Sequence, residues 1–149
     1  MKPQQLSVRF SQLWFAMRLG VWLCTLPLLL RGHSLPILLQ RLTSSRGRRT
    51  KRGQMELEQA VRIVVRLCQL PLFRGRVFPR ACLRQSLALY RVLTGMGYPV
   101  TIHFGVRKDE QILHGHSWVT LLGKPVAERT GNEVFTVVYS YPCPRDRGV

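Results

Sequence analysis

The pattern of apolar and polar residues divides the chain into a helical first half and a strand-rich second half. Residues 5–44 are mostly apolar and predict two helices with a break near Pro27 to Pro36. Residues 45–54 carry closely spaced basic residues among Ser, Thr and Gly, which is typical of an exposed linker. Met55 to Leu70 has apolar residues at helical spacing, and Pro71 ends that helix.

A further helix and an antiparallel sheet are predicted in the remainder of the chain. The helix begins at Ala81 or Cys82, and Gly95 and Gly97 stop it. After Pro99 the pattern changes to strands, with turns at 107–110 and 123–124. The expected strands cover residues 100–106, 115–122, 125–128 and 134–141. Helices followed by consecutive strands predict an α+β fold with an antiparallel sheet.

Charge separates the same two parts of the chain. The 149 residues have a net charge of +16. Residues 1–55 hold ten Lys or Arg and no acid, whereas residues 56–149 hold thirteen against seven. We therefore predict a basic, helical extension and linker at 1–54 and a compact domain at 55–149. The surplus of basic residues predicts acidic partners such as nucleic acid, anionic lipid or an acidic peptide. The basic run at 46–52 contains no aromatic residue on which bases could stack, so nucleic acid is not the expected partner.

Four scattered cysteines without a C-x-x-C pair argue against a zinc ribbon and against a disulfide framework, and they favour a cytoplasmic protein. The apolar run Leu13 to Leu30 is similar to a signal peptide or a membrane span. Arg18 interrupts it, the uninterrupted part is twelve residues, and a span needs roughly twenty. No small-residue cleavage site follows. We expect a buried or partner-facing helix. The alternative is a membrane-surface helix whose arginines meet anionic lipid.

Candidate chemistry begins with Cys82, which follows Arg80 at the predicted start of a helix. Unpaired amide groups and the positive end of the helix dipole favour a thiolate there. His116, on a predicted strand, is the candidate general base. Glu128, expected on the next strand, is the candidate acid that orients the imidazole. A cysteine opening a helix, a histidine on a strand and an acid on the following strand match the order in transglutaminase- and papain-type enzymes.

Several motifs fall in order along this segment: C-L-R-Q-S-L-A-L-Y in the helix, G-Y-P at the strand entry, F-G-V-R-K-D at the strand end, and H-S-W-V on the next strand. Together they resemble the B proteins of lasso-peptide biosynthesis, which are leader-peptide cysteine proteases of the transglutaminase-like superfamily. The resemblance runs from about Arg62 to Glu128. It implies a transglutaminase/papain-like core in which Cys82 is the nucleophile and His116 the general base and acid. Glu128 stands where the family usually has Asp.

The resemblance also implies partners. Many members carry an N-terminal leader-recognition domain, and residues 1–54 do not resemble one. The chain is therefore similar to the stand-alone protease, which acts with a separate recognition protein, the lasso precursor peptide and an ATP-dependent lasso cyclase. No cofactor is implied. The apolar N-terminal helix is expected to dock one of these proteins, and a peripheral membrane contact through the same helix is a further expectation.

Three other interpretations stay open from the sequence. His103, His114 and His116 would form a metal site if a hairpin brought them together, although no metal is expected, since no further ligand completes the set. The chain could instead be a basic adaptor for nucleic acid or membrane with an unreactive Cys82. Alternatively, an amine could replace water as the acyl acceptor, which would make it an acyl- or amide-transfer enzyme on the same scaffold.

Overall fold

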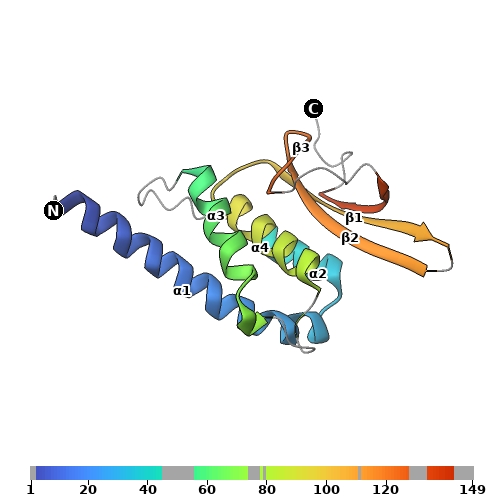
Figure 1. Cartoon of the computed structure of the whole chain (residues 1–149), viewed down its shortest axis with the longest axis horizontal. Helices are drawn as coiled ribbons and strands as arrows, with labels where there is room; N and C mark the ends of the chain where they lie inside the picture. The colour runs from blue at the N-terminus through green and yellow to red at the C-terminus, as the bar shows by residue number, and fades with distance from the viewer. Residues whose placement is uncertain are drawn as a thin grey trace.

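A computed structural model of the chain (Figure 1) describes residues 3–44, 56–73, 78, 80–110, 112–127 and 134–142. Within these ranges, helices come first and an antiparallel sheet follows, which confirms the predicted α+β class. The elements are α1 (Pro3–Gly32), α2 (Leu35–Ser44), α3 (Leu57–Cys68), the 3-10 turn η2 (Pro71–Phe73), α4 (Ala81–Gly95), β1 (Val100–Asp109), β2 (Ile112–Leu121), β3 (Lys124–Pro125) and β4 (Thr136–Tyr141).

The break between the first two helices lies inside the range that the sequence predicts, Pro27 to Pro36. Pro27 lies inside α1, and the break to α2 comes at His33 and Ser34. Proline removes one backbone hydrogen bond from a helix interior. Leu23 and Leu26 are completely buried on the same helix, and this packing keeps the chain helical across the proline.

The fourth helix is the central element of the fold. It packs against β1 and β2 on one side and against α1, α2 and α3 on the others. In Figure 1, α3 and α4 lie between α1 and the sheet. Most of α4 is buried, including Leu87, Leu89, Tyr90 and Leu93. Its predicted start at Ala81 and its predicted end at Gly95 are both confirmed.

A buried arginine of α4 connects this helix to the ends of α3 and η2. The Arg84 side chain is 3% exposed and donates hydrogen bonds to the carbonyls of Cys68, at 2.6 Å, and Phe73. Cys68 is the last residue of α3, where carbonyls lack helical donors and a positive charge is favourable. Arg84 therefore joins the ends of α3 and η2 to the first turn of α4.

The sheet has the strand order β3-β2-β1-β4, with antiparallel pairs throughout. The hairpin of β1 and β2 is longer than predicted, because Arg107 pairs with His114 and Asp109 with Ile112 inside it. The prediction of a turn over residues 107–110 is therefore wrong for 107–109. This end of the hairpin projects beyond the helices (Figure 1), so charged residues can occupy strand positions without being buried.

The second hairpin turn lies at Leu122 and Gly123, both with positive φ, one residue before the predicted Gly123–Lys124 turn. It leads into β3, which consists only of Lys124–Pro125 and pairs with Thr120 and Leu121. The strand predicted over residues 125–128 is therefore shorter than expected and begins one residue earlier. Within the described residues, most of the β2 edge that faces away from β1 is uncovered.

Residues from both halves of the chain share one buried cluster. Leu23 of α1 and Leu39 of α2 belong to the same cluster as Val64 of α3, Leu93 of α4 and Ile102 of β1. The N-terminal helices thus complete the core around α4. The boundary predicted at residue 54 stays a prediction, because residues 45–55 lie outside the described part of the chain.

Candidate functional site

Cys82 is the second residue of α4, and its thiol is free and half-buried. The N-cap position is Arg80, which makes no side-chain capping hydrogen bond, and the first turn contains no acidic residue. A Ser, Thr, Asp or Asn at this position would normally satisfy one of the unpaired amides. The amides at the start of α4 therefore have no side-chain cap, and they face a region where negative charge is favoured.

Ser86 joins the first turn of α4 to β2. Its hydroxyl lies 2.8 Å from the carbonyl oxygen of Cys82 and 2.7 Å from the carbonyl oxygen of Ser117. Within the helix, the Cys82 carbonyl oxygen already accepts a hydrogen bond from the backbone amide of Ser86. The hydrogen bond from the Ser86 hydroxyl is therefore more important for the Ser117 carbonyl, which has no helical donor. Ser117 is the neighbour of His116 on β2. One buried hydroxyl thus ties the turn that carries Cys82 to the residue beside His116.

The Ser117 carbonyl lies on the uncovered edge of β2. The Val119 carbonyl accepts a hydrogen bond from the Val126 amide, on the β3 side of the strand. Carbonyls two residues apart on a strand point to the same side, so the Ser117 carbonyl points to that side as well. The pairs of β3 stop at Thr120, so this strand does not reach Ser117. The first turn of α4 therefore lies along the free edge of β2.

His116 is a half-buried residue of β2 and lies between two aromatic rings. Its imidazole stacks on the Trp118 indole, with ring centroids 5.9 Å apart, and on the Phe135 ring at 5.0 Å. Val119 belongs to the core beneath α4, so strand alternation places His116 and Trp118 on the opposite face of the sheet. The rings fix the plane of the imidazole.

His103 extends this row of rings and is held by both of its nitrogens. Its imidazole stacks on Trp118 at 5.5 Å. Nδ1 lies 2.8 Å from the Ser140 hydroxyl on β4, and Nε2 lies 2.9 Å from the Thr120 hydroxyl on β2. The row of rings therefore runs from His103 on β1, which is held by hydroxyls of β2 and β4, through Trp118 to His116.

The close approach of Trp118 to the sheet depends on Gly105, the residue paired with His116. A Cβ atom at Gly105 would lie 2.9 Å from two atoms of the indole and 3.0 Å from Cβ of Phe135. Real Cβ atoms do not tolerate such contacts unless a neighbour moves. The glycine therefore lets the indole, and with it the imidazole of His116, lie close to the backbone.

The predicted site is only partly described by the structure. Ser86 joins the turn that holds Cys82 to Ser117, the neighbour of His116, but the His116 imidazole lies on the face of the sheet away from α4, and Glu128 and Cys143 lie outside the described residues. The assignment of the three residues as a catalytic set stays a prediction. Cys68, on the inner face of α3, is buried, and burial raises the pKa of its thiol to about 11 despite the nearby Arg84 charge. This thiol is therefore a poor nucleophile.

Two contributors were missed in the sequence. Ser86 lies one helical turn after Cys82, which was the available signal for it, but its bond to a strand carbonyl has no sequence pattern. His103 was read only as a polar strand position or a metal ligand. The metal-site interpretation is not supported, since no three His, Cys, Asp or Glu side chains cluster within the described part of the chain, and both His103 nitrogens contact hydroxyls.

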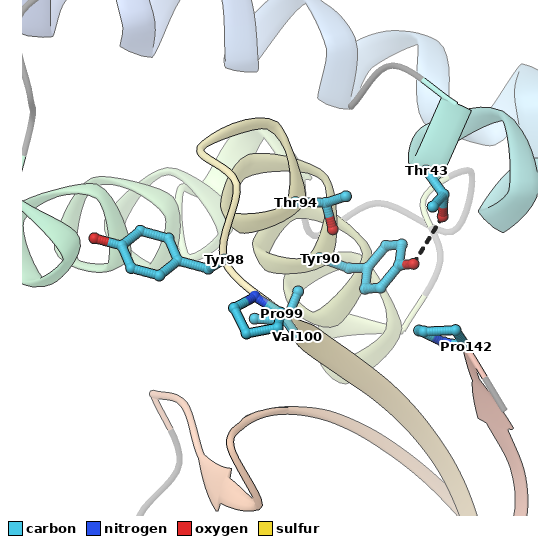
Figure 2. A pocket seen from close by; sticks show the side chains of 7 residues that line it. All are labelled: Thr43, Tyr90, Thr94, Tyr98, Pro99, Val100 and Pro142. Atoms are coloured by element: carbon cyan, nitrogen blue, oxygen red, sulfur yellow. Dashed lines mark hydrogen bonds between the residues drawn. The ribbon is translucent and has the colours of Figure 1, made fainter. Parts of the chain in front are cut away.

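A hollow elsewhere on α4 does not belong to this site. Figure 2 shows Tyr90 and Thr94 lining it from the C-terminal half of α4. The hydroxyl of Thr43, on α2, forms a hydrogen bond of 2.8 Å with the Tyr90 hydroxyl. Pro142, after β4, closes another side. Cys82 is at the other end of the helix. The hollow therefore lies away from the candidate nucleophile.

Comparison with known proteins identifies the family of the fold. Neither the curated proteins nor the solved structures contain a significant match to the chain. One family does match, the transglutaminase-like superfamily, over residues 20–140. The match begins at Gly20, in the second half of α1, and ends at Ser140, next to the last residue of β4. Members of this superfamily are generally enzymes that work through a cysteine. The chain belongs to the transglutaminase-like superfamily.

Proposed function

We propose that the protein is a cysteine peptidase that removes the leader from a lasso-peptide precursor, with Cys82 as nucleophile and His116 as general base and acid. The observation that carries the proposal is the Ser86 bridge, at 2.8 Å from the Cys82 carbonyl and 2.7 Å from the Ser117 carbonyl. It supports a reaction site at the β2 edge, where the thiol comes from α4 and the imidazole would have to reach it from the other face of the sheet. Superfamily membership supports cysteine chemistry.

The reaction begins when the Cys82 thiolate attacks the carbonyl carbon of the scissile peptide bond. The negative charge that develops on the carbonyl oxygen would be stabilised by the uncapped amides at the start of α4. His116 then donates its proton to the leaving amine, which becomes the new N-terminus of the core peptide. Water, deprotonated by the same imidazole, hydrolyses the thioester, which releases the leader as a free acid and restores the thiol.

The aromatic rings beside His116 suit a residue that must keep one orientation during proton transfer. The faces of Trp118 and Phe135 hold the ring in one plane, which limits the orientations that the imidazole can take. His103, itself fixed by two hydroxyls, supports Trp118 from the other side. Glu128 as the third member rests on the family resemblance alone.

The uncovered edge of β2 supports an extended peptide as the substrate. Leu113 and Gly115 lie on the same strand as His116, precede the residues that β3 covers, and are exposed. By alternation, their amides and carbonyls point to the same side as the Ser117 carbonyl. An extended leader could pair with these groups as an added strand. This pairing would place the scissile bond beside the start of α4.

The proposed partners follow from the family resemblance. They are a lasso precursor peptide, a separate leader-recognition protein and an ATP-dependent cyclase that uses the freed amine. A cytoplasmic location fits these partners, because precursor and ATP are available there.

The proposal is tested by incubating the full chain with a precursor peptide and its recognition protein, followed by mass spectrometry. We expect a free leader acid, no cleavage by Cys82→Ala or His116→Phe, and normal cleavage by Cys24→Ser, which removes an exposed thiol at a distance from the site. Iodoacetamide modification of Cys82 should abolish cleavage. A leader joined to an amine would instead indicate acyl transfer. Retained cleavage by Cys82→Ala would disprove the assignment.

A further inference from the structure

The longest helix carries an apolar surface on the side that faces away from the core. Leu19, Trp22, Leu23 and Leu26 of α1 are buried against the other helices. On the opposite side, seven apolar or sulfur-containing residues recur at helical spacing, and they form what we term the α1 stripe: Phe10, Leu13, Trp14, Met17, Val21, Cys24 and Leu28. The six large members are each more than half exposed, from 53% for Met17 to 71% for Phe10. Such a continuous surface usually marks an interaction site.

The charges around the α1 stripe identify the kind of partner. Arg18 and Arg31 are exposed on α1, and Arg9 is on the same helix. Residues 1–55 contain ten basic residues and no acid. Burial, followed by the neighbouring charge of Arg18, lowers the pKa of Arg91 on α4. Arg91 lies over the ring of the buried Trp22, on the core side of α1, so the charges that flank the stripe are those of α1 itself. A second copy of the chain would bring an equally positive surface, so self-association through the stripe is disfavoured.

The shape of the α1 stripe also matters. It runs along α1, with Trp14 and Phe10 near its N-terminal end. Apolar and aromatic residues flanked by arginines are typical of helices that lie in the interface of a bilayer. The segment Phe10–Gly32 is long and apolar enough to cross a membrane. However, crossing would remove Leu23 and Leu26, both fully buried, from the core.

We propose that the α1 stripe binds the surface of an anionic membrane, with the helix parallel to the bilayer and its arginines at the headgroups. The buried side of α1 stays on the core in this arrangement. Because α3 and α4 lie between α1 and the sheet (Figure 1), the free edge of β2 stays accessible to a peptide. The proposal rests on α1 and its charges and is independent of the reaction at Cys82.

Vesicle binding by the full chain tests the proposal. Trp14 is 60% exposed, whereas Trp22 and Trp118 are buried, so a blue shift of tryptophan fluorescence reports Trp14 entering a bilayer. We expect this shift, together with co-sedimentation, with vesicles of phosphatidylcholine and phosphatidylglycerol in equal parts. Vesicles of phosphatidylcholine alone should bind weakly, and salt should reduce binding to the anionic vesicles.

Matched variants separate the α1 stripe from general charge. Met17→Glu with Val21→Glu should weaken binding roughly tenfold or more, because it removes exposed apolar area from the stripe. Ile112→Glu with Leu113→Glu makes the same change in charge on similarly exposed residues of the hairpin and should leave binding nearly unchanged. Circular dichroism checks that both variants fold.

Three results would overturn the proposal. The first is absence of binding by the unmodified protein to the anionic vesicles. The second is equal weakening by the two double variants, which would attribute binding to net charge. The third is a dimer, or a stable complex with the leader-recognition protein or cyclase, that the α1 substitutions dissolve in the absence of vesicles, since the stripe would then be a protein interface.

Discussion

Replacing Ser86 with alanine should break the link between α4 and β2. The Cys82 carbonyl keeps its helical hydrogen bond after this change, but the Ser117 carbonyl loses the hydroxyl at 2.7 Å. Ser86 is only 3% exposed, so water cannot easily replace its hydroxyl. The loss of one net hydrogen bond and the desolvation of the orphaned carbonyl together predict a destabilisation of about 1–3 kcal/mol.

Ser117→Ala is the matched control, because it deletes the same atom from a residue with the same exposed fraction, 3%, in contact with Ser86. The Ser117 hydroxyl is buried and has no hydrogen-bond partner in the described part of the chain. Its removal should therefore change stability by less than about 0.5 kcal/mol, or stabilise the fold slightly, because an unsatisfied polar group is lost.

Urea denaturation followed by circular dichroism measures both effects, and unchanged m values would show that the same surface unfolds in each variant. The proposed function adds a second reading, because Ser86→Ala should also lower kcat/KM more than Ser117→Ala. Equal losses of stability, or a greater loss in Ser117→Ala, would refute the inference that the Ser86 hydroxyl holds the two elements together.

Three further changes test the packing around the site. Arg84→Met removes a buried guanidinium from two backbone carbonyls and should cost about 3 kcal/mol or more, measured by thermal unfolding; an unchanged Tm would contradict this. Gly105→Ala should cost about 1–3 kcal/mol and alter the near-UV signal of Trp118, whereas Gly115→Ala, where a Cβ meets nothing within 4 Å, should do neither. Burial raises the pKa of Cys68 from 9.0 to about 11, so the folded protein keeps a proton that the unfolded chain releases in this range. Stability should therefore fall as pH rises from about 9 to 11, more steeply than in Cys68→Ala, and parallel curves would reject the shift.

The sequence predicted the bounds of an element correctly where the residues at its ends determine the backbone conformation. The start of α4 follows a proline and an arginine, its end is a glycine, and both boundaries were correct. The length of the hairpin was predicted wrongly because Arg107 and Lys108 are residue types that are common in turns. The helices do not cover this end of the hairpin, so its strands do not need to alternate apolar and polar residues. The break predicted near Pro27 to Pro36 lies at His33 and Ser34, and only the burial of neighbouring leucines shows why the helix continues past Pro27.

The candidate site shows the same division. Cys82 and His116 were identifiable from residue type, element and family resemblance. The hydrogen bonds of Ser86 and His103 were not, because each joins residues that are distant in the chain and depends on the register of β1, β2 and β4. The two sides of α1 also needed tertiary packing to be told apart, since both are apolar in sequence.

The guanidinium of Arg84 has a consequence for how this scaffold can diversify. It fixes the carbonyl of Phe73 while itself belonging to the helix that begins at Ala81. The position of Cys82 is thereby coupled to the ends of α3 and η2. A substitution that shifts the Cys68 carbonyl is expected to reach the start of α4 through this one side chain. Evolution, or a protein engineer, can therefore tune the surroundings of the thiol from α3 without changing α4 itself.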